Sequence, residues 1–229
     1  MKRFAVIGLG RFGTKLAVDL AASGAEVIAI DKGKEEIETL RDLVSIAVRL
    51  DSTDEQALRA QGVDKVDVAI VSIGQAHGQG FEAAILTVVN LKQLGVPLIY
   101  TRAEDPIAGE VFSKVGATAV IYPEIESAQR WAFKLLAPHV EDRLDFAPGY
   151  SLARVKASAK FNGKTVRDLQ LRQKYNVNLV AINRAEHAED GANAKDEMVN
   201  VPLPDTVVYK DDILILAGKD TDLAKLPQE

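Results

Sequence analysis

The sequence predicts an α/β protein in which a doubly wound parallel sheet is followed by a small α+β domain. First, short apolar runs alternate with segments of helical periodicity through residues 1–138. Second, the first apolar run leads directly into a glycine-rich turn. Third, the alternation stops at residues 139–150, a charged stretch containing Pro148 and Gly149 that is typical of a linker. The predicted domains are therefore residues 1–138 and 151–229.

The first strand is expected to end in a turn with the sequence Gly8-Leu9-Gly10-Arg11-Phe12-Gly13. A G-x-G-x-x-G pattern between a strand and a helix is the Rossmann-like signature of nucleotide binding. Gly8 permits the tight turn, Gly10 lets backbone amides approach a pyrophosphate, and Gly13 lets the helix pack closely on the strand. We therefore expect phosphates to bind the unpaired amides at the start of this helix.

The helix that follows carries apolar residues at a spacing of four, Phe12, Leu16 and Leu20, and is expected to end at Gly24. A second strand, residues 26–30, leads to Asp31, about 20 residues after the glycine turn. A carboxylate at this position can accept hydrogen bonds from ribose hydroxyls.

Four further strands are predicted, at residues 45–50, 66–73, 98–102 and 119–122. Their apolar runs indicate burial on both faces, and with the first two strands they complete a doubly wound parallel sheet. Helix start signals separate them. Thr53 with Gln56 suggests a capping box, and Asp105 is an N-cap candidate before Pro106.

In such a sheet the ligand lies at the carboxyl ends of the strands. Besides the glycine turn, the residues expected there are Asp31, Lys32, Asp51, Ser52, Thr53, Ser72, Ile73, Gly74 and Arg102. Taken alone, residues 51–53 are explained by helix capping. Their position makes both roles compatible if Asp51 and Ser52 face the base or ribose while Thr53 caps the helix.

Two arginines bear on the type of nucleotide. Arg11 occupies a variable position in the glycine turn, and Arg102 ends the fifth strand. A guanidinium can form a bidentate pair with a terminal phosphate, so two converging cations favour ATP or ADP at least as much as NAD. For Arg102 an exposed strand-end residue is an equal alternative.

The segment from Tyr122 to Glu124 leads from the last strand into a helix that stops before Pro138. Glu124 and Glu126 in the first turn of this helix are explained by the helix dipole. The alternative is that Glu124 lies near a nucleotide phosphate and binds a divalent cation.

The second domain is expected to have βαβββ order. Its predicted elements are a strand at 151–156, a short helix at 164–171, a strand at 178–184, a polar loop at 186–193, and strands at 199–203 and 212–217. This domain is too small to serve as the substrate domain of a dehydrogenase. Its size favours a regulatory or dimerising module.

Composition excludes several classes of function. The net charge of -5 argues against broad nucleic-acid binding, and the lack of cysteine excludes disulfides, thiol catalysis and cysteine-ligated zinc. The histidines His77, His139 and His187 lack metal-ligand spacing and are expected on the surface or in loops. No leader or membrane-spanning pattern is evident, which predicts a cytoplasmic protein.

Taken in order, these features resemble the RCK (KTN) domain of the KtrA and TrkA type. The matching segments are residues 8–13, Asp31, residues 51–53, residues 71–74, Arg102 and residues 122–124. Residues 163–172, 177–182 and 212–218 resemble the C-terminal domain that accompanies it. The likeness covers nearly the whole chain.

The resemblance implies a non-catalytic regulatory subunit that gates a membrane-embedded potassium translocating subunit from the inner face of the membrane. It implies dimers stacked into an octameric ring, with ATP favouring the active ring and ADP the inactive one. Arg11 would contact the γ-phosphate, Asp31 the ribose, and Glu124 a cation at the dimer interface.

The resemblance also implies a ligand for the second domain, cyclic di-AMP. Arg172, Asn178 and Leu179 match that site, whereas Gln170 stands where an acid is expected.

Two other readings stay open at this point. A small NAD(P)-dependent oxidoreductase or an NAD(H)-sensing regulator would use the same glycine turn and acid. An enzyme also needs a proton donor and a substrate pocket, and the sequence offers no convincing pair of catalytic residues. A redox-sensing repressor needs a DNA-binding element, and no basic stripe or helix-turn-helix is evident.

Overall fold

A computed structural model describes residues 1–74, 79–184 and 197–227. The chain divides into two compact units, residues Met1–Ser127 and Ala128–Glu229. The division falls inside helix α6 (Pro123–Leu136), before the end of the first predicted domain. In the described parts of the chain, no helix is both long and apolar enough to cross a membrane.

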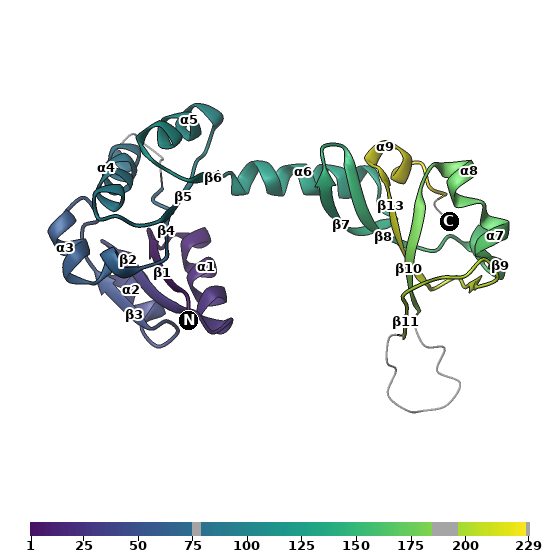
Figure 1. Ribbon diagram of the computed structural model, residues 1–229, viewed down its shortest axis with the longest axis horizontal. Helices are drawn as coiled ribbons and strands as arrows, with labels where there is room; N and C mark the ends of the chain where they lie inside the picture. Colours follow the sequence, from purple (N-terminus) through teal and green to yellow (C-terminus); the bar gives the residue numbers. More distant parts are fainter. Residues whose placement is uncertain (75–78, 185–196, 228–229) are drawn as a thin grey trace. The chain divides into compact units, whose positions relative to one another are not determined.

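The first unit is built on a six-stranded parallel sheet with strand order β3-β2-β1-β4-β5-β6 (Figure 1). Its strands are β1 (Arg3–Ile7), β2 (Glu26–Asp31), β3 (Ile46–Arg49), β4 (Val68–Val71), β5 (Leu98–Arg102) and β6 (Ala119–Ile121). Its helices are α1 (Arg11–Ala22), α2 (Lys34–Leu40), α3 (Glu55–Ala60), the short 3-10 helix η1 (Val63–Lys65), α4 (Gln79–Gln93) and α5 (Pro106–Val115). This order confirms the predicted doubly wound sheet.

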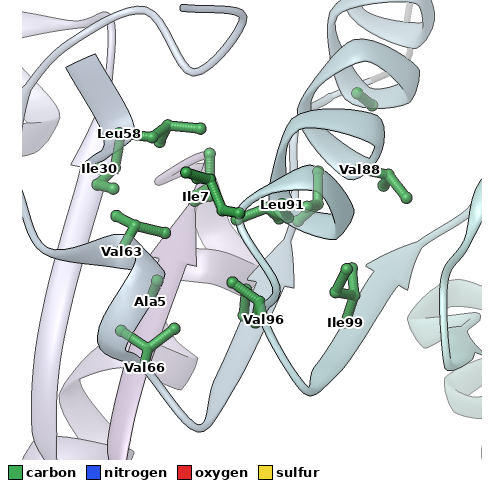
Figure 2. Packing of buried hydrophobic residues seen from close by; sticks show 14 of the residues in the cluster. Ala5, Ile7, Ile30, Leu58, Val63, Val66, Val88, Leu91, Val96 and Ile99 are labelled. Carbon is green, nitrogen blue, oxygen red and sulfur yellow. The ribbon is translucent and has the colours of Figure 1, made fainter. Parts of the chain in front are cut away.

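Successive residues of each central strand point to opposite faces of the sheet, and both faces are covered. Ile7 belongs to a core that includes Leu58 of α3 and Leu91 of α4 (Figure 2). The preceding residue, Val6, packs in a second core with Ala17 of α1 and residues of α2. Burying each such aliphatic side chain stabilises the fold by about 1.5–3 kcal/mol, so both faces hold the strand ends in position.

One predicted helix cap in this unit is confirmed and one is wrong. The Asp105 carboxylate accepts a hydrogen bond from the Ala108 amide at 2.9 Å, with proline at the first helical position. At α3 the cap is Asp54, not Thr53. Thr53 is unavailable because its amide and hydroxyl both donate to the Asp51 carboxylate, at 3.0 and 2.7 Å.

The second unit contains a five-stranded antiparallel sheet with strand order β11-β10-β13-β8-β7, and a two-stranded ladder of β12 with β9. Its strands are β7 (Val140–Ala147), β8 (Tyr150–Lys156), β9 (Lys164–Thr165), β10 (Asn178–Arg184), β11 (Glu197–Val199), β12 (Val207–Val208) and β13 (Ile213–Lys219). Its helices are the 3-10 helix η2 (Ala159–Phe161), α7 (Val166–Leu169), α8 (Leu171–Tyr175) and α9 (Asp220–Leu223). The domain is thus α+β, with more elements than the predicted βαβββ order.

The stretch interpreted as a linker forms strand β7 instead. Residues 140–147 pair with β8, and the two residues between these strands, Pro148 and Gly149, form the turn. Gly149 has φ +74°, a left-handed conformation that glycine adopts without a steric penalty. The proline and glycine therefore mark a hairpin turn and not a flexible connection.

Two further predictions for this unit differ from the structure. The strand predicted at 199–203 is wrong beyond its first residue, because β11 ends at Val199. Pro202 and Pro204 lack an amide hydrogen, and a turn joins Leu203 to Thr206. The helix predicted at 164–171 is divided into α7 and α8 by Gln170, which has φ +50°. The predicted polar loop at 186–193 lies outside the described residues.

The three histidines were expected on the surface or in loops. His139 lies in the turn between α6 and β7, as expected, but it is half-buried and its Nε2 lies 3.1 Å from the Leu223 carbonyl oxygen. His77 and His187 lie outside the described residues.

Candidate functional site

A cleft of about 350 Å³ lies at the carboxyl ends of the central strands in the first unit. Its walls come from the ends of β1, β2 and β4, the loop after β3, and the first turns of α4. The lining residues are Ile7, Gly8, Gly10, Ile30, Asp31, Lys32, Leu50, Ser52, Ser72, Ile73, Gly74, Gly80 and Ala83. This is the edge of the sheet at which doubly wound folds bind their ligands.

Most of the predicted binding residues lie in or beside this cleft. Those that line it are Gly8, Gly10, Asp31, Lys32, Ser52, Ile73 and Gly74. Leu9 and Arg11 line a second hollow, which Gly10 shares. Phe12, Gly13, Asp51, Arg102 and Glu124 line neither space.

The three glycines of the turn are needed for different reasons. Gly8 has φ +90°, and a Cβ there would lie 2.7 Å from the Ile73 amide nitrogen. A Cβ on Gly13 would lie 2.0 Å from the Gly8 carbonyl oxygen. These contacts confirm that Gly8 serves the turn and Gly13 the helix packing. A Cβ on Gly10 would meet no atom within 4 Å, so the protein's own packing does not require glycine there.

The start of α1 offers hydrogen-bond donors to a ligand. The first helical bond runs from the Thr14 amide to the Gly10 carbonyl, at 2.9 Å, and Gly10 provides no side-chain cap. The amides of the first turn therefore lack an acceptor within the helix. The Arg11 side chain is exposed, and no described residue accepts a hydrogen bond or forms an ion pair with it. The free amides and the Arg11 guanidinium together make the N-terminal end of α1 electrostatically positive.

Asp31 connects the second strand to the glycine turn. Its Oδ2 accepts a hydrogen bond from the Leu9 amide at 2.6 Å, and its Oδ1 accepts one from the Gly33 amide at 2.7 Å. A carboxylate oxygen can accept a second hydrogen bond, so Asp31 retains capacity for a ligand hydroxyl. The bond to Leu9 positions the turn, a role that the sequence did not reveal.

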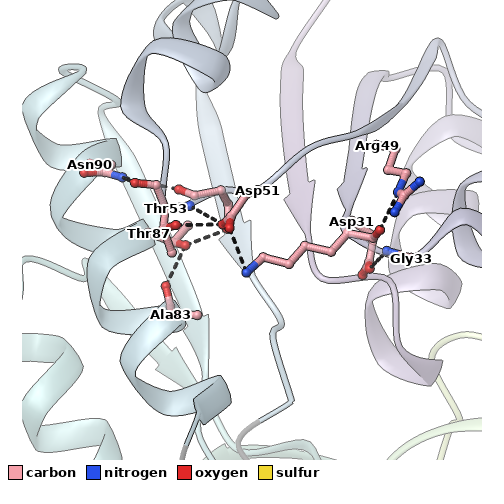
Figure 3. A network of polar contacts seen from close by, with 10 residues as sticks. Asp31, Gly33, Arg49, Asp51, Thr53, Ala83, Thr87 and Asn90 are labelled. Carbon is pink, nitrogen blue, oxygen red and sulfur yellow. Dashed lines mark hydrogen bonds and ion pairs between the residues drawn. The ribbon is translucent and has the colours of Figure 1, made fainter.

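Asp51 and Lys32 form an ion pair at the rim, with 2.9 Å between Oδ2 and Nζ (Figure 3). The Thr53 amide is the largest influence on the Asp51 carboxyl, and with the Lys32 ammonium it lowers the pKa of Asp51 to about 2. Asp51 is therefore ionised at neutral pH. Its oxygens are occupied by Thr53 and Lys32, which makes the pair part of the cleft's framework.

The loop after β3 is held against α4 by side chains that sequence reasoning missed. Ser52 Oγ lies 2.7 Å from Thr87 Oγ1, and Asn90 Nδ2 donates to the Thr53 carbonyl at 2.9 Å (Figure 3). Thr87 and Asn90 are polar residues three apart in an otherwise largely apolar helix, which is the only signal that the sequence carried.

Ser72, which directly follows β4, was expected at this edge of the sheet but was not named as a binding residue. It lines the cleft, is only 3% exposed, and its hydroxyl has no hydrogen-bond partner among the described residues. A buried hydroxyl usually has a partner, so a ligand group is a suitable one for Ser72.

Arg102 and Glu124 contact each other. Arg102 Nη2 lies 2.7 Å from Glu124 Oε1 and 3.8 Å from a Glu104 carboxylate oxygen. In the described part of the chain, no three acidic or histidine side chains gather as a metal site. The cation role of Glu124 stays a prediction.

The residues matched to a second ligand are divided in the second unit. Asn178 is exposed in a hollow of about 310 Å³ that Phe146, Tyr150 and Lys219 also line. Arg172 is exposed on α8 and does not line this hollow, whereas Leu179 packs against the core of the unit.

Comparison with known proteins gives consistent results. The TrkA-N domain family matches residues 4–123, and the TrkA-C domain family matches residues 151–227. The chain is 37% identical to Ktr system potassium uptake protein C of Bacillus subtilis over 224 residues, covering 98% of this chain and 95% of the relative. It is 30% identical to Ktr system potassium uptake protein A of the same organism, covering 100% and 96%.

Solved structures share the fold. The GsuK RCK domain is 17% identical, with a TM-score of 0.59, and the match covers 98% of this chain and 46% of that one. The NAD(P)-binding domain of an exopolyphosphatase-related protein from Archaeoglobus fulgidus is 28% identical, with a TM-score of 0.50, covering 59% of this chain and 98% of that domain.

Proposed function

The chain belongs to the family of proteins that join a TrkA-N domain to a TrkA-C domain, and from this premise we propose that it is a nucleotide-sensing regulatory subunit of a bacterial potassium uptake system. Its relatives named as Ktr potassium uptake proteins align over nearly their whole length, which supports the proposal. The subunit acts in the cytoplasm beneath a membrane-embedded translocating partner, as dimers in an octameric ring. It senses ligands and catalyses no reaction.

The observation that supports nucleotide sensing is the start of α1. The helix has no side-chain cap, and the protein leaves open space where Gly10 lacks a Cβ. Arg11 is exposed beside these amides with no partner in the described chain. Free amides at a helix N-terminus and an adjacent guanidinium are a suitable site for a polyphosphate.

The number of phosphates is the proposed signal, with ATP activating and ADP inactivating. A ligand shifts a conformational equilibrium only by its differential affinity for the two states. A terminal phosphate that pairs with Arg11 provides this difference. At about 1–3 kcal/mol of coupling free energy per site, several sites in one ring can together change the translocating subunit from its inactive to its active state.

The test is a calorimetric titration of the purified protein with ATP, ADP, NAD and NADH, repeated with the Arg11→Ala variant. ATP and ADP should bind the wild type without turnover, and Arg11→Ala should lose more affinity for ATP than for ADP. Arg41→Ala, which removes an exposed guanidinium that lines neither the cleft nor the hollow beside Arg11, is the matched control. Equal losses for both nucleotides in Arg11→Ala would contradict the role of Arg11.

NAD(H) is the second candidate ligand. Asp31 has the position of the acid that binds the ribose of NAD, and the related NAD(P)-binding domain from Archaeoglobus fulgidus supports this candidate. Selective binding of NADH in the same titration would favour an NAD(H)-sensing regulator. NAD(H) turnover with a small substrate would favour an oxidoreductase.

We extend the proposal to a cation at Glu124, divalent or monovalent. Glu124 Oε1 accepts from Arg102, which leaves Oε2 as an oxygen ligand for a cation. Glu124→Gln should abolish any effect of Mg²⁺ or Ca²⁺ on nucleotide affinity. An unchanged metal response would eliminate this site.

Cyclic di-AMP is the proposed ligand of the second unit. The aromatic rings and Lys219 around Asn178 offer stacking surfaces and a cation for such a ligand. Titration of the wild type and Asn178→Ala with cyclic di-AMP tests this, and equal binding to both proteins would remove Asn178 from the site.

A further inference from the structure

The hydrogen bonds around Ser52 determine whether its hydroxyl group donates or accepts toward the cleft. Thr87 Oγ1 lies 2.7 Å from the Ala83 carbonyl oxygen, and 2.7 Å from Ser52 Oγ. A carbonyl oxygen only accepts, so the single hydroxyl proton of Thr87 is donated to Ala83. Ser52 must then donate its own proton to Thr87. The Ser52 oxygen is left with acceptor capacity only.

This arrangement is held by packing. Ser52 is 4% exposed although it lines the cleft, and Thr87 is fully buried. Asn90 Nδ2 donates to the carbonyls of Ser52 and Thr53, at 3.3 and 2.9 Å, which ties the backbone of the loop to α4 (Figure 3). The acceptor character of Ser52 is therefore built into the site before a ligand arrives.

The order of the strands indicates which part of a nucleotide meets Ser52. The glycine turn follows β1, Asp31 ends β2, and Ser52 follows β3, which lies beyond β2 from β1. Neighbouring strands are about 4.8 Å apart, so the strand that leads to Ser52 is the farthest of the three from the glycine turn. The cleft there has the apolar side chain of Leu50 as a wall. The base of the nucleotide fits this position.

We propose that Ser52, fixed as an acceptor by Thr87, is a specificity determinant that selects a 6-aminopurine over a 6-oxopurine. This inference rests on the nucleotide-binding function proposed above. An exocyclic amine donates to the Ser52 oxygen, whereas a carbonyl at the same place faces another acceptor and leaves both without a partner. Ser52 contacts the base, and Thr87 is a positioning residue.

The test compares ADP with inosine diphosphate, which differ at the six-position of the purine. Wild-type protein should bind ADP more tightly by roughly tenfold, the value of one hydrogen bond against one mismatch. In Thr87→Val the Ser52 proton is released, and the ratio of affinities should shift toward inosine diphosphate by roughly tenfold. Thr87→Ser keeps the hydroxyl group and should show the wild-type ratio.

Two further variants separate this effect from a loss of structure. Thr39→Val removes the same kind of hydroxyl-to-carbonyl bond in α2, with no bond to another side chain, and should leave the ratio unchanged. Ser52→Ala removes the acceptor and should bring the ratio near one. Thermal denaturation measures the stability of each variant, and a general loosening would weaken both ligands alike.

The outcomes are distinguishable. A wild type that binds neither nucleotide refutes the proposed function. A wild type that binds both equally, or a folded Thr87→Val with the wild-type ratio, overturns the role of Ser52 and Thr87 alone. A shift of the ratio in Thr87→Val that is absent from Thr87→Ser supports the role of Ser52 and Thr87.

Discussion

Replacing Gly10 with alanine separates ligand binding from folding. Gly10 has φ −66°, which alanine adopts freely, and the new Cβ meets no protein atom within 4 Å. Alanine is a poorer N-cap than glycine by up to about 1 kcal/mol. Its lower entropy in the unfolded chain offsets about 0.4–1 kcal/mol of this. The net change in unfolding free energy should be within about 0.5 kcal/mol, and the melting temperature should move by less than about 2 °C.

Nucleotide binding should respond much more strongly. The methyl group stands in the open space beside the free amides, where a phosphate oxygen would approach. Losing one charge-assisted hydrogen bond costs about 1.5–3 kcal/mol. ADP affinity measured by calorimetry should therefore fall by about 10- to 150-fold.

Gly13→Ala provides the contrast. Its Cβ would lie 2.0 Å from the Gly8 carbonyl oxygen, so α1 must move away from the turn. Overpacking of this kind costs about 1–3 kcal/mol, and the melting temperature should fall clearly. A folded Gly10→Ala protein that binds ADP within twofold of wild type would refute the reasoning about the open space.

Two other predictions concern stability. Because the folded-state pKa of Asp51 is about 2, below its ordinary value of 3.8, its contribution is complete above pH 4 and is lost as the pH falls toward 2. Because the Asp51 side chain is about half exposed, its contribution to the unfolding free energy is at most about 1 kcal/mol. Urea unfolding of the wild type and Asp51→Asn at several pH values should show their difference shrinking over that range, and a constant difference would contradict it. Gly149→Ala places a Cβ at φ +74° in the turn between β7 and β8. It should cost about 1–2 kcal/mol of unfolding free energy, whereas an unchanged value would mean that the turn adapts.

Local patterns were sufficient for the strands and the glycine turn of the first unit. Apolar runs and the spacing of Gly8, Gly10 and Gly13 predicted the strands, the turn and the cleft, because each signal lies within a few consecutive residues. The second unit was harder. Residues 148 and 149 are consistent with either a linker or a hairpin, and only the pairing of β7 with β8 distinguishes them.

What the sequence by itself determined is the doubly wound sheet and the edge of the sheet that carries the cleft, since periodicity and glycine positions depend on the backbone alone. Tertiary structure decided how the polar groups are paired. Asp31 accepts a hydrogen bond from the Leu9 amide, and the hydroxyls of Ser52 and Thr87, 35 residues apart, share another. Such pairs join residues distant in the chain, and a hydrogen bond depends on distance and direction in space, which no linear pattern records.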